Sequence, residues 1–165
     1  MVVSRKRVIF AQIINMYKVN DIFYSLQGEG YNTGRAAVFV RFAGCNLRCP
    51  FCDTEFDSFR EMTCEEIVAE MTHYPARLAV LTGGEPTLQV DEAFIDLLHQ
   101  HGFKVAMESN GTRPAPQNLD WLTVSPKVSG EGWLVKGEGR MSQGDRPPVT
   151  RRLSLDQGHV EAAQA

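Results

Sequence analysis

The chain has 165 residues, about the size of one average domain, and its apolar fraction of 43% and charged fraction of 22% are ordinary for a globular protein. Seventeen Lys and Arg residues against twenty Asp and Glu residues give a net charge of −3, which argues against a nucleic acid or a membrane surface as the main partner. The sequence contains no run of about 18 apolar residues, so it predicts no membrane span.

Composition divides the chain into three parts. Residues 1–15 carry three basic residues and no acidic one, and we expect them to form an N-terminal extension. Residues 16–127 alternate apolar runs with helical patterns and are predicted to be the core domain. Residues 128–165 hold six of the fourteen glycines and the Pro147-Pro148 pair without a sustained apolar period, which predicts a poorly ordered tail.

The core domain reads as alternating strands and helices. A capping box at Thr63 and Glu66 and the apolar face of Ile67, Val68 and Met71 predict one helix. A second helix is expected over 92–101, closed by Gly102. Short apolar runs predict strands at 36–42, 78–81, 103–107 and 121–124. Strands and helices alternating at this spacing indicate an α/β fold with a parallel sheet and right-handed crossovers.

A polar segment follows each predicted strand. Because the carboxyl ends of parallel strands share one edge, these segments are expected to meet there, as they do in enzymes of this class. The segments are Gly44-Cys45, Thr82-Gly83-Gly84-Glu85, Glu108-Ser109-Asn110-Gly111 and Ser125-Pro126-Lys127.

Three of the four cysteines, Cys45, Cys49 and Cys52, lie within eight residues in a C-x3-C-x2-C pattern. Such crowding favours a metal or cluster site over disulfides, and hence a reducing compartment such as the cytoplasm. Thiolates bind zinc or iron–sulfur clusters. Three ligands with one open position suit a 4Fe-4S cluster, whereas a zinc knuckle, the alternative, needs a fourth ligand. Cys64 is the one remaining cysteine, and a half-buried cysteine at a helix start is more often a core residue than a ligand.

The cysteine spacing, with Phe51 before the last cysteine, resembles the radical S-adenosylmethionine superfamily. The segment Gly83-Gly84-Glu85-Pro86 is similar to that superfamily's motif for the methionine amino group. The resemblance implies an incomplete (β/α) barrel of parallel strands, here shortened after about the fourth or fifth strand. It also implies a 4Fe-4S cluster and S-adenosylmethionine, which together generate a 5′-deoxyadenosyl radical.

A closer resemblance is to the 7-carboxy-7-deazaguanine synthase family of queuosine biosynthesis. The matching segments are 24–30, 34–35, 41–45, 52–54, 82–86, 108–112 and 124–127. The resemblance implies a radical carbon–nitrogen lyase that contracts the ring of 6-carboxy-5,6,7,8-tetrahydropterin to 7-carboxy-7-deazaguanine and releases ammonia. It further implies magnesium, a flavodoxin-type or other reductant and a homodimer, without nucleic acid or membrane as partner.

The resemblance also assigns site residues by motif position. Substrate would be bound by Leu26, Gln27, Gly28, Arg41 and Thr82. The methionine cofactor would lie beside Phe51, Cys52, Asp53, Gly84, Ser125, Pro126 and Lys127. The cluster would be held by Cys45, Cys49 and Cys52, and magnesium by Thr54. Two of these assignments agree with the chemistry, since a guanidinium such as that of Arg41 suits a carboxylate and a hydroxyl suits a hard cation.

The resemblance fades after Lys127, where family members continue with further strands and a segment that closes over substrate. We therefore expect cluster and cofactor binding to survive better than turnover in this chain. Two alternatives stay open: a glycyl-radical-enzyme activase, which shares the cysteine pattern but not Gln27 and Arg41, and a truncated non-catalytic iron–sulfur or zinc-binding module.

Overall fold

The computed structural model describes residues 15–49, 52 and 58–127, and the backbone of three short strands at 133–135, 139–141 and 160–162. A seven-stranded sheet has the order β3-β1-β2-β4-β5-β6-β9. Its strands are β1 (Met16–Leu26), β2 (Ala36–Phe42), β3 (Arg60–Thr63), β4 (Leu78–Gly83), β5 (Lys104–Ser109), β6 (Trp121–Val124) and β9 (Val160–Ala162). The helices are α1 (Cys64–Thr72) and α2 (Glu92–Gln100), and β7 (Trp133–Val135) pairs with β8 (Gly139–Met141) in a separate antiparallel ribbon.

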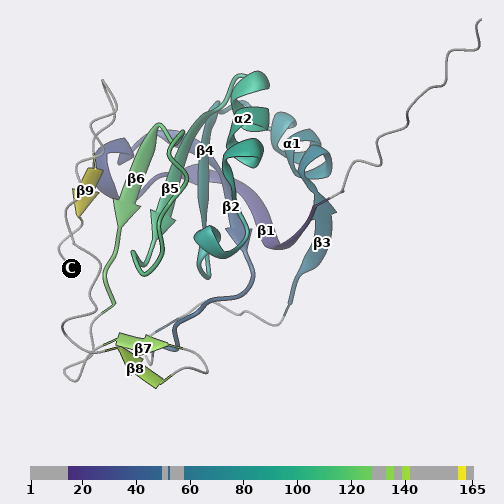
Figure 1. The fold of residues 1–165 in the computed structure, drawn as a ribbon. Coiled ribbons are helices and arrows are strands. Elements are labelled where there is room, and N and C mark those ends of the chain that lie inside the picture. The colour runs from purple at the N-terminus through teal and green to yellow at the C-terminus, as the bar shows by residue number, and fades with distance from the viewer. Residues whose placement is uncertain are drawn as a thin grey trace, which may run out of the picture.

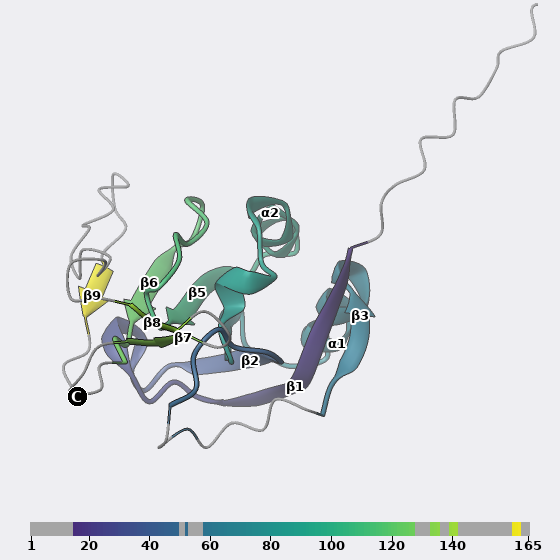
Figure 2. The ribbon, with the colours of Figure 1, turned by 60° about the horizontal axis from the view of Figure 1, so that its bottom comes forward.

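The centre of the sheet is parallel, as the sequence predicts. Strands β2, β4, β5, β6 and β9 run in one direction, and the predicted α/β fold class is confirmed. Two further strands, β1 and β3, pair antiparallel at one edge and make the sheet mixed. The strands follow one another in an arc, and both helices lie on the same side of it (Figures 1 and 2).

Both predicted helices form, and their caps explain where they begin. Thr63 accepts a hydrogen bond from the Glu66 amide at 3.2 Å, and the Glu66 carboxylate accepts one from the Thr63 amide at 2.8 Å. This capping box satisfies two free donors of α1. Asp91 caps α2 by accepting from the Phe94 amide at 2.9 Å. After α2, Gly102 adopts a φ of 78°, which ends the helix as expected.

The helix-covered face of the sheet carries the main core. Alternate strand residues such as Val38, Val40, Ala79, Leu81 and Val105 are buried there against the apolar faces of the helices. The helices contribute Ile67, Val68, Met71, Phe94, Ile95 and Leu98. Because side chains alternate along a strand, the neighbouring strand residues point to the opposite face.

The opposite face holds a smaller apolar layer. Phe39, Val80, Ala106 and Trp121 lie side by side on four neighbouring strands and are buried. The segment that follows β1 crosses this face, since the ring of Tyr31 stacks on that of Trp121 with centroids 4.6 Å apart. This crossing brings residues of the first loop to β6, although the two are far apart in sequence.

The predicted N-terminal extension, residues 1–15, lies outside the described residues except for its last position, and so does most of the predicted tail, 128–165. Both nine-residue α-helices in the described part of the chain are too short to cross a membrane.

Candidate functional site at the strand ends

Two residues further along each strand, the face opposite the helices becomes polar. In the sheet, Arg41 pairs with Thr82, and Glu108 pairs with Thr123. Thr82 and Glu108 are also neighbours, because each comes directly after a member of the pair Leu81 and Met107. Side chains two residues apart on a strand share a face. A row of four polar side chains therefore lies directly above the apolar layer, at the carboxyl ends of the parallel strands.

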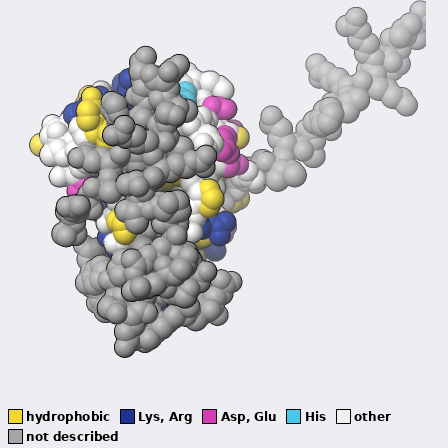
Figure 3. Space-filling model, turned by 60° about the vertical axis from the view of Figure 1, so that its left-hand side comes forward, with side chains coloured by type: hydrophobic (Ala, Val, Ile, Leu, Met, Phe, Trp, Pro, Cys, Tyr) yellow, Lys and Arg dark blue, Asp and Glu magenta, His cyan; other side chains and the backbone are white. Residues whose placement is uncertain are grey.

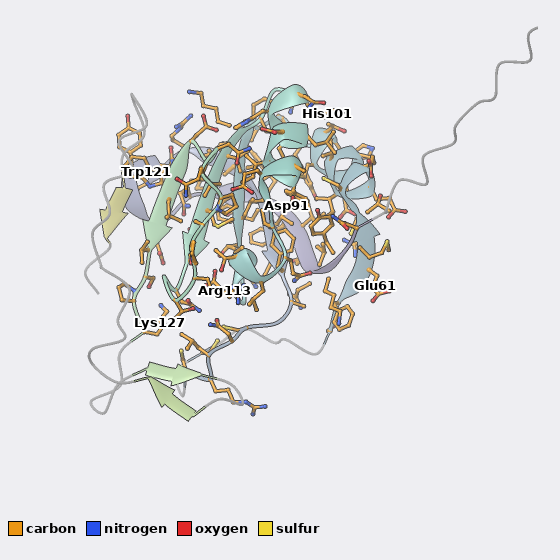
Figure 4. The ribbon with its side chains drawn as sticks, in the orientation of Figure 1. Glu61, Asp91, His101, Arg113, Trp121 and Lys127 are labelled. Atoms are coloured by element: carbon orange, nitrogen blue, oxygen red, sulfur yellow. The ribbon has the colours of Figure 1, made fainter. Side chains whose placement is uncertain are left out.

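These strand ends surround a cavity of about 340 Å³. The residues that line it come from the first loop and from four consecutive strand ends: Glu29, Arg41, Cys45, Leu47, Cys49, Cys52, Thr82, Gly83, Gly84, Glu108, Ser109, Asn110, Ser125 and Lys127. In Figure 4, Lys127 lies just beyond the carboxyl end of β6, whereas Trp121 marks its start at the other end of the sheet. The predicted meeting of four strand-end segments is thus what the structure shows.

The two glycines at the end of β4, Gly83 and Gly84, let the cysteine loop pack directly on the strand end. Gly83 has a φ of 109°, and a Cβ on Gly84 would overlap the carbonyl oxygen of Gly44. The contact is hydrogen-bonded, because the Gly84 amide donates to Phe42 O and the Glu85 amide to Gly44 O, each at 2.9 Å. Only a residue without a side chain permits this approach, so the Gly-Gly pair fixes the place of Cys45.

Glu85 follows the glycines and turns into the protein instead of into the cavity. Its side chain is 0% exposed. The carboxylate accepts hydrogen bonds from Thr87 N and Oγ1, from Ser109 Oγ at 2.9 Å and from Asn110 N at 2.7 Å. A buried carboxylate needs such donors. Glu85 therefore joins the ends of β4 and β5.

Glu108 is the centre of the polar row. One carboxylate oxygen accepts from Gln27 Nε2 at 2.8 Å, and the other accepts from Thr82 Oγ1 at 2.7 Å. Gln27 is only 4% exposed, and its Oε1 accepts from the Glu29 amide at 3.1 Å. Hydrogen bonds to an ionised acceptor are the strong ones. Glu108 thus locks two of the predicted substrate residues in fixed orientations.

Two cationic side chains face the same cavity. Arg41 makes no ion pair within the described part of the chain, and its guanidinium carbon lies 5.3 Å from the centroid of the Phe23 ring. The Lys127 ammonium donates to Ser125 Oγ at 2.6 Å. The Glu108 carboxylate accepts hydrogen bonds from neutral side chains, so Arg41 and Lys127 can both still bind an anionic ligand.

The three clustered cysteines line the cavity as free thiols, with Cys45 and Cys49 half-buried and Cys52 exposed. Burial raises the pKa of Cys45, although the N–H of Leu47 at 3.4 Å partly offsets this. Burial, and then Cys52, raise the pKa of Cys49, while Lys127 lowers it. Forming thiolates there calls for nearby positive charge, and a bound metal supplies it.

The donor set fits an iron–sulfur cluster. Three thiols surround one cavity, and soft thiolates are the ligands that such clusters take. Within the described residues, no three His, Cys, Asp or Glu side chains are already close enough to hold a metal ion. At least one of the three cysteine side chains must therefore move toward a common centre when a cluster binds.

Not every predicted site residue reaches the cavity. Leu26 is 65% exposed at the end of β1, and neither it nor Gly28 or Pro126 lines the cavity. Gln27 is absent from the lining too, and contributes through Glu108. The predictions for Phe51, Asp53 and Thr54 lie outside the described residues.

Cys64 packs against the main core and does not line the cavity. Burial raises its pKa to about 12, with Glu65 and Asp91 adding to the effect. The thiol is therefore protonated near neutral pH, as expected for a core residue.

Sequence reasoning did not assign roles to several residues that the structure brings to the cavity. Glu108 and Asn110 belong to a strand-end segment that the sequence analysis did single out, and Glu29 and Leu47 lie within the first loop and the cysteine loop. A signal existed for Glu108, since it interrupts the buried run of β5 on the face opposite the helices, where an unpaired carboxylate would be costly. On the face turned toward the viewer in Figure 3, the described side chains form only small separate groups of acidic, basic and apolar residues, which give no comparable signal.

Comparison with known proteins agrees with this geometry. The family model "Radical SAM superfamily" matches residues 39–126, which run from the middle of β2 to just past β6 and include the cysteine loop. The 7-carboxy-7-deazaguanine synthase of Bacteroides thetaiotaomicron is 59% identical over 112 residues, covering 68% of this chain and 62% of the relative. The synthase of Bradyrhizobium diazoefficiens is 46% identical over 144 residues, covering 73% of this chain and 68% of that protein.

A solved structure also matches. The crystal structure of QueE from Escherichia coli superimposes with a TM-score of 0.65 at 34% sequence identity, over 72% of this chain and 64% of that one. This chain therefore spans somewhat less than two thirds of the length of some of the relatives it matches. The matched part contains the cysteine loop, the Gly-Gly pair and the polar row, and the chain belongs to the radical SAM superfamily and, within it, to the 7-carboxy-7-deazaguanine synthase family.

Proposed function

We propose that this chain binds a 4Fe-4S cluster and S-adenosylmethionine and converts 6-carboxy-5,6,7,8-tetrahydropterin into 7-carboxy-7-deazaguanine with release of ammonia. The activity is that named for its relatives. The observation that carries the proposal is the shared cavity: the free thiols and three members of the polar row, Arg41, Thr82 and Glu108, line the same space at the strand ends.

Cys45, Cys49 and Cys52 would hold the cluster, and when bound, the cluster and S-adenosylmethionine supply the radical chemistry of the superfamily. Gly84 would leave room for the methionine end of the cofactor, because it lines the cavity without a side chain. Lys127, held by Ser125, would meet a carboxylate. Phe51, Asp53 and Pro126 remain proposed neighbours of the cofactor on the strength of the motif.

The polar row would bind the pterin. Arg41 would pair with the substrate carboxylate through its two parallel N–H groups. Thr82 would contact the ring edge, and its hydroxyl proton is committed to Glu108, so it offers an acceptor lone pair to a substrate N–H. Gln27 would hold Glu108 in place from behind. Leu26 and Gly28, which do not line the cavity, remain proposed substrate neighbours on the strength of the motif.

Further elements of the proposal come from the family pattern. Thr54 would supply a hydroxyl to a magnesium ion shared with substrate oxygens. We also propose a homodimer, a flavodoxin-type or other electron donor, a cytoplasmic location, and no nucleic-acid or membrane partner. The domain division proposed is an extension at 1–15, the catalytic core at 16–127 and a separate tail at 128–165.

The experiment is an anaerobic assay of the iron-loaded chain with the tetrahydropterin, S-adenosylmethionine, magnesium and a strong reductant, with the product followed by liquid chromatography and mass spectrometry. We expect 7-carboxy-7-deazaguanine from the wild type and none from Cys49→Ala. Cys64→Ala is the matched control, because Cys64 does not line the cavity, and it should retain the product. Iron binding without any deazaguanine would instead support a non-catalytic cluster-binding module.

A further inference from the structure

We propose that Asn110 is a positioning residue of the cluster site whose side-chain N–H donates to the sulfur of Cys45 and raises the reduction potential of the cluster bound there. The inference rests on the proposed function, since it takes Cys45 as a cluster ligand. It adds a role that the cysteine pattern does not contain, because Asn110 lies 65 residues further along the chain, directly after β5.

The geometry places two N–H donors around one sulfur. Asn110 Nδ2 lies 3.9 Å from Cys45 Sγ and also donates to Asn46 Oδ1 at 3.1 Å. The backbone N–H of Leu47 lies 3.4 Å from the same sulfur. Cys45 is thus contacted from its own loop and from the end of β5, two strands away from β2 in the sheet.

The orientation of the Asn110 amide is set by its own hydrogen bonds. Its Oδ1 accepts from Thr112 N at 2.9 Å and from Thr112 Oγ1 at 2.6 Å. Asn46 Nδ2 closes the ring by donating to Thr112 Oγ1 at 2.8 Å. With the oxygen committed to donors on one side, the NH2 group must face the cysteine loop.

The backbone of Asn110 is anchored as firmly as its side chain. Its N–H donates to the buried Glu85 carboxylate at 2.7 Å, and the residue is 7% exposed. Next to it, Ser109 O accepts from Ser125 N at 2.9 Å. The donor is therefore held in place before any ligand arrives, which is how a residue outside the ligand set tunes a metal site.

The direction of the change in reduction potential follows from charge. Reduction adds an electron to the cluster and its thiolates, and an N–H directed at a thiolate sulfur stabilises that more negative state. Because Asn110 is buried and Cys45 is half-buried, water screens this particular contact less than it would at the surface. Removing the donor should move the midpoint potential to a more negative value.

The test is an EPR-monitored redox titration of the iron-loaded chain without S-adenosylmethionine. Asn110→Leu removes the donor at similar size and should shift the midpoint to a more negative potential. Asn46→Ala loosens the same hydrogen-bonded ring without removing the contact to sulfur, and should leave the midpoint unchanged. Equal shifts in both variants would mean that loop packing sets the potential, and would overturn the inference.

A second measurement does not depend on Asn110→Leu folding. Asn46→Ala protein labelled with amide-15N asparagine should show a 15N hyperfine coupling to the reduced cluster in pulsed EPR. A cluster without that coupling, or an unchanged midpoint in Asn110→Leu, overturns the role of Asn110 while leaving the proposed function standing. Failure of the wild type to form a 4Fe-4S cluster overturns both.

Discussion

Gly84 lies so close to Gly44 that a Cβ on Gly84 would overlap the carbonyl oxygen of Gly44. The two residues come from neighbouring parallel strands, β4 and β2, and meet just beyond their carboxyl ends. The contact seats the loop that carries Cys45 on the end of β4, where Thr82 belongs to the polar row. The proposed cluster ligands and substrate residues thus share one rim because two glycines let two strand ends touch.

The first prediction concerns this contact. Gly84→Ala should force the backbone apart and lower the free energy of unfolding by about 1–3 kcal/mol, the usual cost of overpacking. It should also lower the iron bound per chain after anaerobic reconstitution. Gly28→Ala is the matched control, because a Cβ there meets nothing within 4 Å. Urea denaturation and iron analysis check both variants, and equal behaviour of the two would contradict the prediction.

The second prediction concerns the buried carboxylate of Glu85. In Glu85→Gln, an NH2 group replaces one of the two acceptor oxygens. It then faces a donor, which is either the Asn110 amide or the hydroxyls of Thr87 and Ser109. An unmade buried hydrogen bond costs about 1–3 kcal/mol. We expect the free energy of unfolding, measured by urea denaturation, to fall by that amount. Glu61→Gln on the exposed edge strand, far from the site in Figure 4, should change stability by less than about 0.5 kcal/mol.

The third prediction concerns Arg41. Lysine keeps the charge but loses the planar pair of N–H groups, so Arg41→Lys should raise KM for the tetrahydropterin by about 10- to 100-fold. The EPR spectrum of the cluster should not change. Arg113→Lys is the control, because Arg113 is exposed and does not line the cavity. An unchanged KM in Arg41→Lys would place the substrate carboxylate elsewhere.

The fourth prediction concerns pH and Cys64. With its pKa raised to about 12 by burial, the thiol is neutral at lower pH, and its alkylation rate in the folded apo chain should rise about tenfold per pH unit up to pH 10. A rate that levels off below pH 10 would show an ordinary thiol. The neutral form is the one that folding favours, so this contribution to stability is full below the unfolded-state pKa and is lost as the pH rises toward 12.

Much of the fold follows from local signals in the sequence. The capping box at Thr63 and Glu66 and the buried run 36–42 contain their own start and stop residues, so their bounds agree with the structure. Strand β1 gave no such signal, because its register shifts between Val19 and Asp21. A bulge there moves the apolar alternation by one residue, so that Tyr17 and Val19 are in phase with each other but not with Ile22.

Some features of the candidate site also follow from local signals in the sequence, whereas others depend on long-range contacts. The cysteine spacing and the Gly-Gly pair are short motifs that the sequence displays directly, and they point to the correct rim. The hydrogen bonds from Gln27 and Thr82 to Glu108 span 81 and 26 residues and depend on the register of three strands. The inward turn of Glu85 likewise depends on where β5 ends. Such long-range relations have no local signature, so the sequence alone did not assign them.

The proposed function requires that three cysteines hold a cluster with one iron left free for S-adenosylmethionine. The most direct test is to mix the anaerobically reconstituted, dithionite-reduced chain with S-adenosylmethionine and to measure 5′-deoxyadenosine by mass spectrometry. We expect the wild type and Cys64→Ala to form 5′-deoxyadenosine and Cys45→Ala, Cys49→Ala and Cys52→Ala to form none. An iron-loaded wild type that forms none, or a Cys49→Ala chain that forms as much as the wild type, would contradict the proposed function.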